Sequence, residues 1–248
     1  MRRLLSFIGI LALMALGFGA GVFYMFFPRE SVVLHQDAIV EGFTSEEARV
    51  SLKNDAGQYI DIEPTGEATT LFIFYPGGLV RPQAYEWLGV ALTPLGVRTV
   101  IPVFTADLAV TAPSRATQLL EKLGGYERVV IGGHSLGGAM AARYALNNAG
   151  TLDGLVLMGA FSAESDNLSV FELPTLVLAA EHDGLATLSE IEAGLARLPR
   201  DASLEIIEGS VHSFFGRYGP QRGDGLPTVS RTQAEADIIQ TLSAFFSN

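Results

Sequence analysis

The stretch that decides the fold of this chain is Arg128-Val129-Val130-Ile131-Gly132-Gly133-His134-Ser135-Leu136-Gly137-Gly138. Residues 129–131 are β-branched and uncharged, which is typical of a strand buried on both faces. Residues 139–146 are rich in alanine and other strong helix formers. The sequence therefore predicts a buried strand, a tight turn and a helix in direct succession.

The turn carries the pattern Gly133-x-Ser135-x-Gly137, which is typical of a nucleophile elbow, a sharp turn between a strand and a helix. Side chains two positions before and after the serine would collide there, and glycine removes that collision. Ser135 would stand at a helix N-terminus, where free N–H groups favour developing negative charge. We therefore expect Ser135 to be a nucleophile, with His134 pointing away from its hydroxyl. A plain glycine-serine turn is the alternative, which the flanking strand and helix disfavour.

A serine hydroxyl needs a histidine as its base and a carboxylate that orients the histidine. Proteins with a nucleophile elbow carry both downstream of the serine, the acid before the histidine. Of the two downstream histidines, His182 and His212, His212 fits this chain order, because Asp183 lies between the serine and His212 in the loop after a predicted strand. We expect Asp183 to be this acid and His212 the base; a loop Asp-Gly turn and a surface histidine are the alternatives. Two other carboxylates are alternative candidates for the acid: Glu181 and Asp166.

A second loop with glycines, Pro76-Gly77-Gly78-Leu79, follows a predicted buried strand at residues 69–75. Glycines in this place let backbone N–H groups approach a ligand. Beside a nucleophile elbow, such a loop supplies one donor of the oxyanion hole, and the residue after the nucleophile supplies the other. We therefore expect Gly78 or Leu79, together with Leu136, to hold an oxyanion. A glycine turn without a role is the alternative.

Strand and helix patterns alternate along the chain, which predicts an α/β fold with a mostly parallel sheet covered by helices on both faces. Ligands bind such sheets at the carboxyl ends of the strands, where the loops with the motifs begin. An edge hairpin is expected before this sheet, at residues 48–52 and 58–62. The other expected strands are 97–103, 152–159, 174–180 and 204–207. The other expected helices are 82–95, 112–123, 188–198 and one that begins at a capping box, Ser230-Arg231-Thr232-Gln233.

The composition excludes several classes of function. The chain has 248 residues, 48% of them hydrophobic, and a formal net charge of −11, which disfavours nucleic acid as a partner. It has no cysteine, which excludes disulfides, thiolate zinc sites and a cysteine nucleophile. Its four histidines lie far apart and form no His-Glu-x-x-His pattern. We therefore expect no metal and no cofactor, and a small molecule as the substrate.

The N-terminus begins with Met1-Arg2-Arg3, and no charged side chain follows in residues 4–27. About 20 apolar residues span a membrane, and the two arginines favour an N-terminus in the cytoplasm. We therefore expect a single-pass transmembrane anchor that places the rest of the chain outside the cytoplasm. A signal peptide cut near Gly19-Ala20-Gly21, followed by secretion, is the alternative. Against it, residues 22–27 stay apolar and aromatic beyond that point.

Several stretches carry a resemblance to a known family: residues 74–78, 133–141, 181–184, 212–219, 221–225 and 230–233. Through them, the chain between about Leu71 and Phe246 resembles the α/β-hydrolase superfamily, and within it a bacterial, dienelactone-hydrolase-like branch called α/β-hydrolase fold-5. One departure is Ser210-Val211-His212, where that branch usually has Gly-Asn-His. The resemblance implies a serine hydrolase scaffold and carries over no substrate.

These observations predict three parts: a membrane anchor or signal peptide at 1–29, edge strands and a linker at 30–68, and an α/β-hydrolase domain at 69–248. Residues 160–173 are too few for the helical cap of many lipases and esterases, so we expect small or polar acyl substrates. Arg217 and Arg222 follow His212 in a long loop and are candidates to bind an anionic group of the substrate; solvated loop arginines are the alternative.

The sequence as a whole predicts a membrane-anchored, extracytoplasmic serine hydrolase of the esterase type. A catalytically silent binding or scaffold protein with the same fold is the alternative, because a fold does not guarantee a function. Among enzymes, peptidase, lipase and haloperoxidase-like activities stay open.

Overall fold

The structure is a computed structural model that describes residues 2–26 and 48–247. Within helix α1 (Arg2–Phe26) it describes the side chains of residues 9–23. The chain divides into two units, Met1–Val32 and Val33–Asn248. Residues 30–47 of the part predicted as edge strands and a linker, 30–68, lie outside the described residues.

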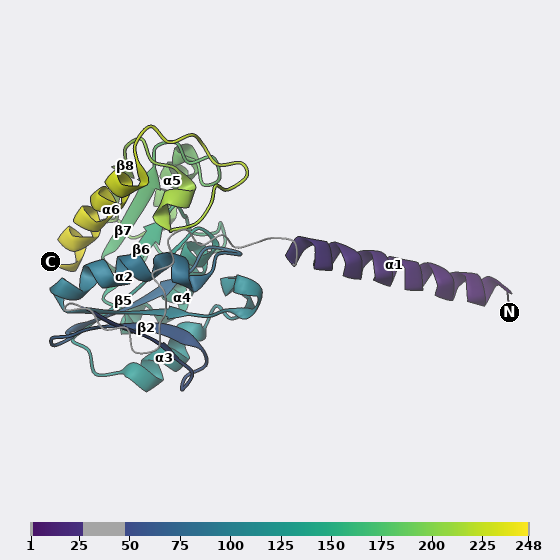
Figure 1. The fold of residues 1–248 in the computed structure, drawn as a ribbon, viewed down its shortest axis with the longest axis horizontal. Coiled ribbons are helices and arrows are strands. Elements are labelled where there is room, and N and C mark those ends of the chain that lie inside the picture. The colour runs from purple at the N-terminus through teal and green to yellow at the C-terminus, as the bar shows by residue number, and fades with distance from the viewer. Residues whose placement is uncertain (1, 27–47, 248) are drawn as a thin grey trace. The chain divides into compact units, whose positions relative to one another are not determined.

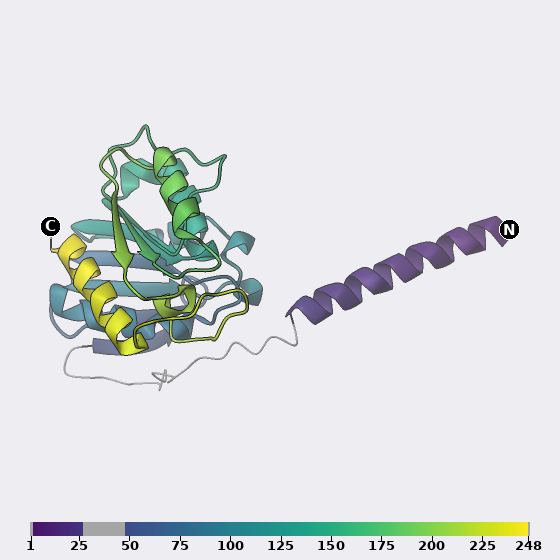
Figure 2. The same ribbon diagram turned by 90° about the horizontal axis from the view of Figure 1, so that it is seen from above.

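The second unit is built on an eight-stranded sheet with the order β1-β2-β4-β3-β5-β6-β7-β8 (Figures 1 and 2). Strand β2 is antiparallel to both of its neighbours, and all pairs from β4 to β8 are parallel. The predicted edge hairpin and mostly parallel sheet are therefore both confirmed. The strands are β1 (Ala48–Lys53), β2 (Tyr59–Pro64), β3 (Thr70–Tyr75), β4 (Val97–Pro102), β5 (Arg128–His134), β6 (Gly154–Met158), β7 (Thr175–Ala180) and β8 (Ser203–Ile207).

Helices cover both faces of this sheet, and the strand side chains alternate between them. Phe72 and Phe74 of β3 pack in the hydrophobic core under α2 and α6, whereas Leu71 and Ile73 pack in the core under α3, α4 and α5. This alternation is what a strand buried on both faces requires. The helices are α2 (Glu86–Leu92), α3 (Arg115–Leu123), α4 (Leu136–Asn148), α5 (Leu188–Gly194) and α6 (Arg231–Phe246).

Two helix predictions need correction. The helix expected at 82–95 is a short α2 between two 3₁₀ turns, Pro82–Tyr85 and Thr93–Leu95; a proline at position 94, which lacks an N–H, favours the end of α2 before it. The hydroxyl of Ser230 accepts the N–H of Gln233 at 3.1 Å. The side chain of Gln233, however, donates to Asp237, so only half of the expected capping box forms.

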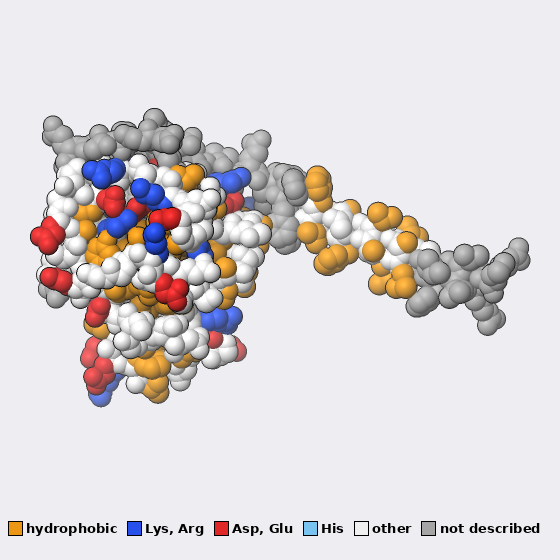
Figure 3. All heavy atoms as spheres, turned by 90° about the horizontal axis from the view of Figure 1, so that it is seen from below, with side chains coloured by type: hydrophobic (Ala, Val, Ile, Leu, Met, Phe, Trp, Pro, Cys, Tyr) orange, Lys and Arg blue, Asp and Glu red, His pale blue; other side chains and the backbone are white. Residues whose placement is uncertain are grey.

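Helix α1 makes up the described part of the first unit. Its described side chains include exposed hydrophobic residues such as Leu13, Leu16 and Phe18. Figure 3 shows hydrophobic side chains along this helix. Among the described residues, no helix is both long enough and apolar enough to cross a membrane. The stretch predicted to span a membrane, residues 4–27, extends beyond the described side chains at both ends.

Candidate active site

The turn between β5 and α4 has the geometry of a nucleophile elbow. Ser135 has φ 53° and ψ −125°, a backbone conformation that residues other than glycine rarely adopt. The neighbouring chain passes very close: a Cβ on Gly137 would lie 2.2 Å from the carbonyl oxygens of Tyr75 and Pro76, and one on Gly133 would lie 2.6 Å from that of Tyr75. The turn therefore requires glycine at both positions, as the sequence pattern predicts.

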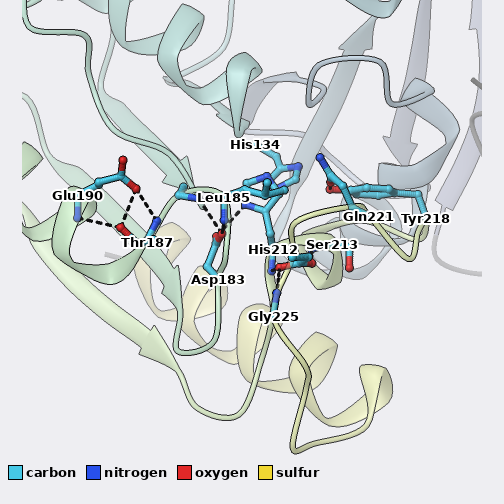
Figure 4. A network of polar contacts seen from close by, with 12 residues as sticks. His134, Asp183, Leu185, Thr187, Glu190, His212, Ser213, Tyr218, Gln221 and Gly225 are labelled. Carbon is cyan, nitrogen blue, oxygen red and sulfur yellow. Dashed lines mark hydrogen bonds and ion pairs between the residues drawn. The ribbon is translucent and has the colours of Figure 1, made fainter.

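Asp183 and His212 come from the loops after β7 and β8 and lie together. Oδ2 of Asp183 is 2.7 Å from Nδ1 of His212 (Figure 4), and both side chains are buried. The other carboxylate oxygen, Oδ1, accepts the N–H groups of Leu185 at 2.8 Å and Ala186 at 2.7 Å. Asp183 is thus fixed by its own loop and directs one oxygen at the histidine ring.

The two alternative candidates for the acid, Glu181 and Asp166, have other partners. Glu181 accepts the N–H of Gly209 at 2.7 Å, and Asp166 forms an ion pair with Arg143 at 2.9 Å. Of the three carboxylates considered from the sequence, Asp183 is the one bonded to His212.

Ser135 is not hydrogen-bonded to this pair. Nε2 of His212 is buried, and within residues 2–26 and 48–247 it has no hydrogen-bond partner. Bonds between a nucleophile and its base are often long without substrate and tighten in the complex. The acid is therefore bonded to the base, and among the described residues nothing bonds to the second ring nitrogen of the base.

The hydrogen bonds of the loop after β3 show which of its two expected oxyanion donors, the N–H of Gly78 or that of Leu79, has no other acceptor among the described residues. The N–H of Leu79 donates to the carbonyl of Asp107 at 2.8 Å, so the expectation for Leu79 does not fit this geometry. Gly78 lies against the first residue of α4, since a Cβ on Gly78 would be 3.4 Å from Cβ of Leu136. In the described part of the chain, no acceptor is bonded to the N–H of Gly78 or Leu136. These two N–H groups remain as candidate donors.

The expectation for Arg217 also needs correction. Its guanidinium donates to both carboxylate oxygens of Glu235, at 3.0 and 3.1 Å, and lies over the ring of Trp87. A two-bond pair of this kind is strong and directional, so this charge is not free for a substrate. Arg222 is exposed, and its expected role stays a prediction.

Asp224 is a residue of this site that the sequence analysis did not single out, although it lies in the stretch 221–225 that carries the resemblance. Its carboxylate accepts the N–H groups of His212 at 3.0 Å, Ser213 at 2.8 Å and Gly225 at 2.9 Å. A carboxylate that binds three backbone donors fixes the loop that carries the histidine. Asp224 therefore acts on the backbone of His212, whereas Asp183 acts on its ring.

We predict that Asp224→Ala lowers the kcat of any reaction in which His212 acts as a base by about 10- to 100-fold, because a shift of about 1 Å in a reacting group has effects of this size. Three N–H groups lose their acceptor, so the melting temperature also falls. Kinetics and thermal unfolding measure the two effects. The matched control is Asp201→Ala, which removes an exposed carboxylate. A folded Asp224→Ala protein with the kcat of the wild type would contradict the prediction.

The groups at this edge of the sheet form a set that acyl transfer uses: a serine on a strained turn, a histidine bonded to a carboxylate, and two unbonded N–H groups. Among the described residues, no group of three or more His, Asp or Glu side chains is arranged to hold a metal ion.

Comparisons with known proteins define the class. The sequence model of the alpha/beta hydrolase family matches residues 71–236, which is more than half of the chain. The chain therefore belongs to the α/β-hydrolase family, and the resemblance found in the sequence is confirmed at the level of the superfamily.

A similar solved structure is that of a predicted CIB-like hydrolase from Thermoplasma acidophilum, with a TM-score of 0.62 and 15% sequence identity over 81% of this chain and 99% of that chain. At this identity, the similarity shows the fold alone. No curated protein matches the chain.

Proposed function

We propose that this chain is a serine hydrolase that transfers the acyl group of a small ester to water. The observation that carries the proposal is the buried bond of 2.7 Å between Asp183 and His212. Their loops leave the sheet at the carboxyl ends of parallel strands, as the strained turn at Ser135 does. Family membership supports hydrolase chemistry, and these residues supply the proposed mechanism.

In the proposed reaction, Oγ of Ser135 attacks the ester carbonyl while Nε2 of His212 takes the hydroxyl proton. The carbonyl oxygen becomes negative and is held by the N–H groups of Gly78 and Leu136. The C–O bond to the alcohol then breaks, and the alcohol leaves with the proton from His212. Water, activated by the same nitrogen, attacks the acyl-enzyme, and the acid leaves with Ser135 restored. Asp183 stabilises the charged imidazole throughout.

A fluorophosphonate probe tests the proposal, because it reacts covalently with activated serines. The full-length protein should be labelled at Ser135 and should hydrolyse 4-nitrophenyl acetate. A silent binding or scaffold protein would do neither, so a folded wild-type protein without labelling and without hydrolysis would refute the proposal.

The proposed substrates are small or polar esters. Residues 159–174, between β6 and β7, contain turns and no helix or strand, so this segment offers no helical cap against a long acyl chain. Burial of each methylene contributes about 0.8 kcal/mol, and a site without that apolar surface gains little from added carbons. We predict that kcat/KM does not rise across 4-nitrophenyl esters from acetate to decanoate. A steady rise would contradict this prediction.

We also propose that the N-terminal segment anchors the hydrolase domain to a membrane, with the domain outside the cytoplasm. Arg2 and Arg3 before the uncharged stretch 4–27 support this orientation. The full-length protein is predicted to stay with membranes after a carbonate wash, whereas a chain that starts at Glu30 is released. N-terminal sequencing separates the alternative, because a mature protein that begins near Ala20 would indicate a cleaved signal peptide.

A further inference from the structure

His134 is a buried histidine beside the proposed site, and the proposed reaction gives it no role. It ends β5, directly before Ser135, and is wholly buried. Its ring centre lies 4.4 Å from that of His212, with the two ring planes at 45° (Figure 4). Its Nδ1 lies 2.8 Å from the hydroxyl of Tyr85. His134 thus contacts the proposed base on one side and a tyrosine hydroxyl on another.

Tyr85 connects this histidine to the loop after β3, residues 76–79, which we call the oxyanion loop. Its side chain is wholly buried, and its hydroxyl accepts the N–H of Gly77 at 3.0 Å. An amide N–H can only donate, so the proton of the tyrosine hydroxyl is available for Nδ1 of His134. Burial raises the pKa of Tyr85, so the tyrosine keeps this proton. The contacts therefore form a chain from Gly77 N–H to Tyr85 and from its O–H to His134.

The charge state of His134 fits this arrangement. Burial, and then the proximity of His212, lower the pKa of His134 well below its ordinary value of 6.5, so the ring is neutral at neutral pH. A neutral ring that accepts at Nδ1 carries its proton on Nε2. His212 becomes positive during the proposed reaction, and a second charged ring at this distance would repel it. A neutral ring avoids that repulsion.

The backbone of the oxyanion loop lies directly against both side chains. A Cβ on Gly77 would lie 2.9 Å from Nδ1 of His134 and 2.9 Å from the hydroxyl oxygen of Tyr85. The next residue along, Gly78, carries one of the two unbonded N–H groups. The position of that donor therefore depends on Tyr85 and on His134, and the ring of His134 also packs against the base.

We infer that Tyr85 and His134 are a pair of positioning residues. Together they fix the position of the N–H of Gly78, the proposed oxyanion donor, relative to the ring of His212. The inference rests on the proposed function, because it assigns positions relative to the proposed reaction. Neither side chain is required to touch the substrate.

Tyr85→Phe tests the inference, because it removes one oxygen atom and leaves the ring. The loss of an oxyanion donor costs about 100- to 1000-fold in kcat, so its misplacement is expected to cost about 10- to 100-fold. We expect KM for 4-nitrophenyl acetate to stay within about threefold, since the donor acts on the transition state. The matched control is Tyr144→Phe, which removes a partly buried hydroxyl bonded to Thr117 at 3.2 Å and should leave kcat unchanged.

Substitutions of His134 provide an independent test. Asparagine can place its carbonyl oxygen near the position of Nδ1 and accept the tyrosine proton, whereas leucine fills the space without an acceptor. We expect His134→Asn to retain more of kcat than His134→Leu. If the two residues act as one unit, the double variant Tyr85→Phe/His134→Leu loses about as much as the worse single variant, not the product of both losses.

The outcomes separate this inference from the proposed function. A wild-type protein that hydrolyses the ester, together with a folded Tyr85→Phe protein of unchanged kcat, would overturn the inference and leave the proposed function intact. Equal kcat for His134→Asn and His134→Leu would likewise overturn it. A wild-type protein that neither hydrolyses the ester nor reacts with a fluorophosphonate would instead refute the proposed function.

Discussion

Replacement of Ser135 by alanine is expected to lower kcat for 4-nitrophenyl acetate by about a thousandfold or more and to abolish fluorophosphonate labelling. The substitution removes the oxygen that would form the acyl-enzyme in the proposed reaction and leaves the N–H groups of Gly78 and Leu136 in place. Alanine is as restricted as serine at a φ of 53°, so the strain of the turn is nearly the same in both proteins. The fold is therefore expected to persist while the chemistry is lost.

Labelling, kinetics and thermal unfolding on the same preparation measure these effects. Ser203→Ala serves as the control, because Ser203 begins β8, at the opposite end of the strand from the loop that carries His212. Its labelling and kcat should equal those of the wild type. A folded Ser135→Ala protein with full activity would show that another residue is the nucleophile.

The fold was predictable because its determinants are local in the sequence. The strand residues before Ser135 and the helix formers after it fix the elbow, and the glycines at 133 and 137 are required by contacts with the backbone at the end of β3. Alternating segments at the start of the domain predict the edge hairpin that the structure contains. Helix ends were less predictable, because the 3₁₀ turns beside α2 involve small energy differences.

The partners of long side chains were not predictable. The sequence of its loop alone suggests that Arg217 could bind an anion. Its partner Glu235, however, lies eighteen residues further along the chain, in α6. The sequence gives no sign of that contact, because α6 reaches the arginine only after the sheet and its helices have assembled. An arginine in a loop therefore indicates an anion site only when its neighbours in space are known.

Backbone donors were unpredictable for a similar reason. Gly78 and Leu79 are equivalent candidates in the sequence, and the distinction comes from the carbonyl of Asp107, which lies in the segment after β4 and accepts the N–H of Leu79. Asp224 likewise becomes important only when its loop reaches the N–H groups of His212 and Ser213. Sequence patterns located the edge of the sheet and its polar residues, and tertiary contacts decide how each of them is used.

Asp183→Asn is expected to have the second large effect, a loss of about 1000- to 10000-fold in kcat. Oδ1 of Asp183 accepts two N–H groups, those of Leu185 and Ala186. An asparagine can satisfy them only with its carbonyl oxygen, because its amide nitrogen only donates. That nitrogen then faces Nδ1 of His212 at the position of Oδ2, so Nδ1 must become an acceptor and the ring proton must lie on Nε2.

A histidine protonated at Nε2 cannot take the proton of Ser135, so the variant should be slow although every hydrogen bond around position 183 is retained. We therefore expect KM and the melting temperature to change little while kcat falls strongly. Steady-state kinetics measure KM and kcat, and thermal unfolding measures the melting temperature. Glu181→Gln is the matched control, since it also replaces a carboxylate by an amide and can still accept the N–H of Gly209; its kcat should stay near that of the wild type. A folded Asp183→Asn protein within tenfold of the wild-type kcat would mean that the tautomer of His212 is not set by this carboxylate. Because the substitution alters the position of one proton and not the packing, a large loss would report on the base itself.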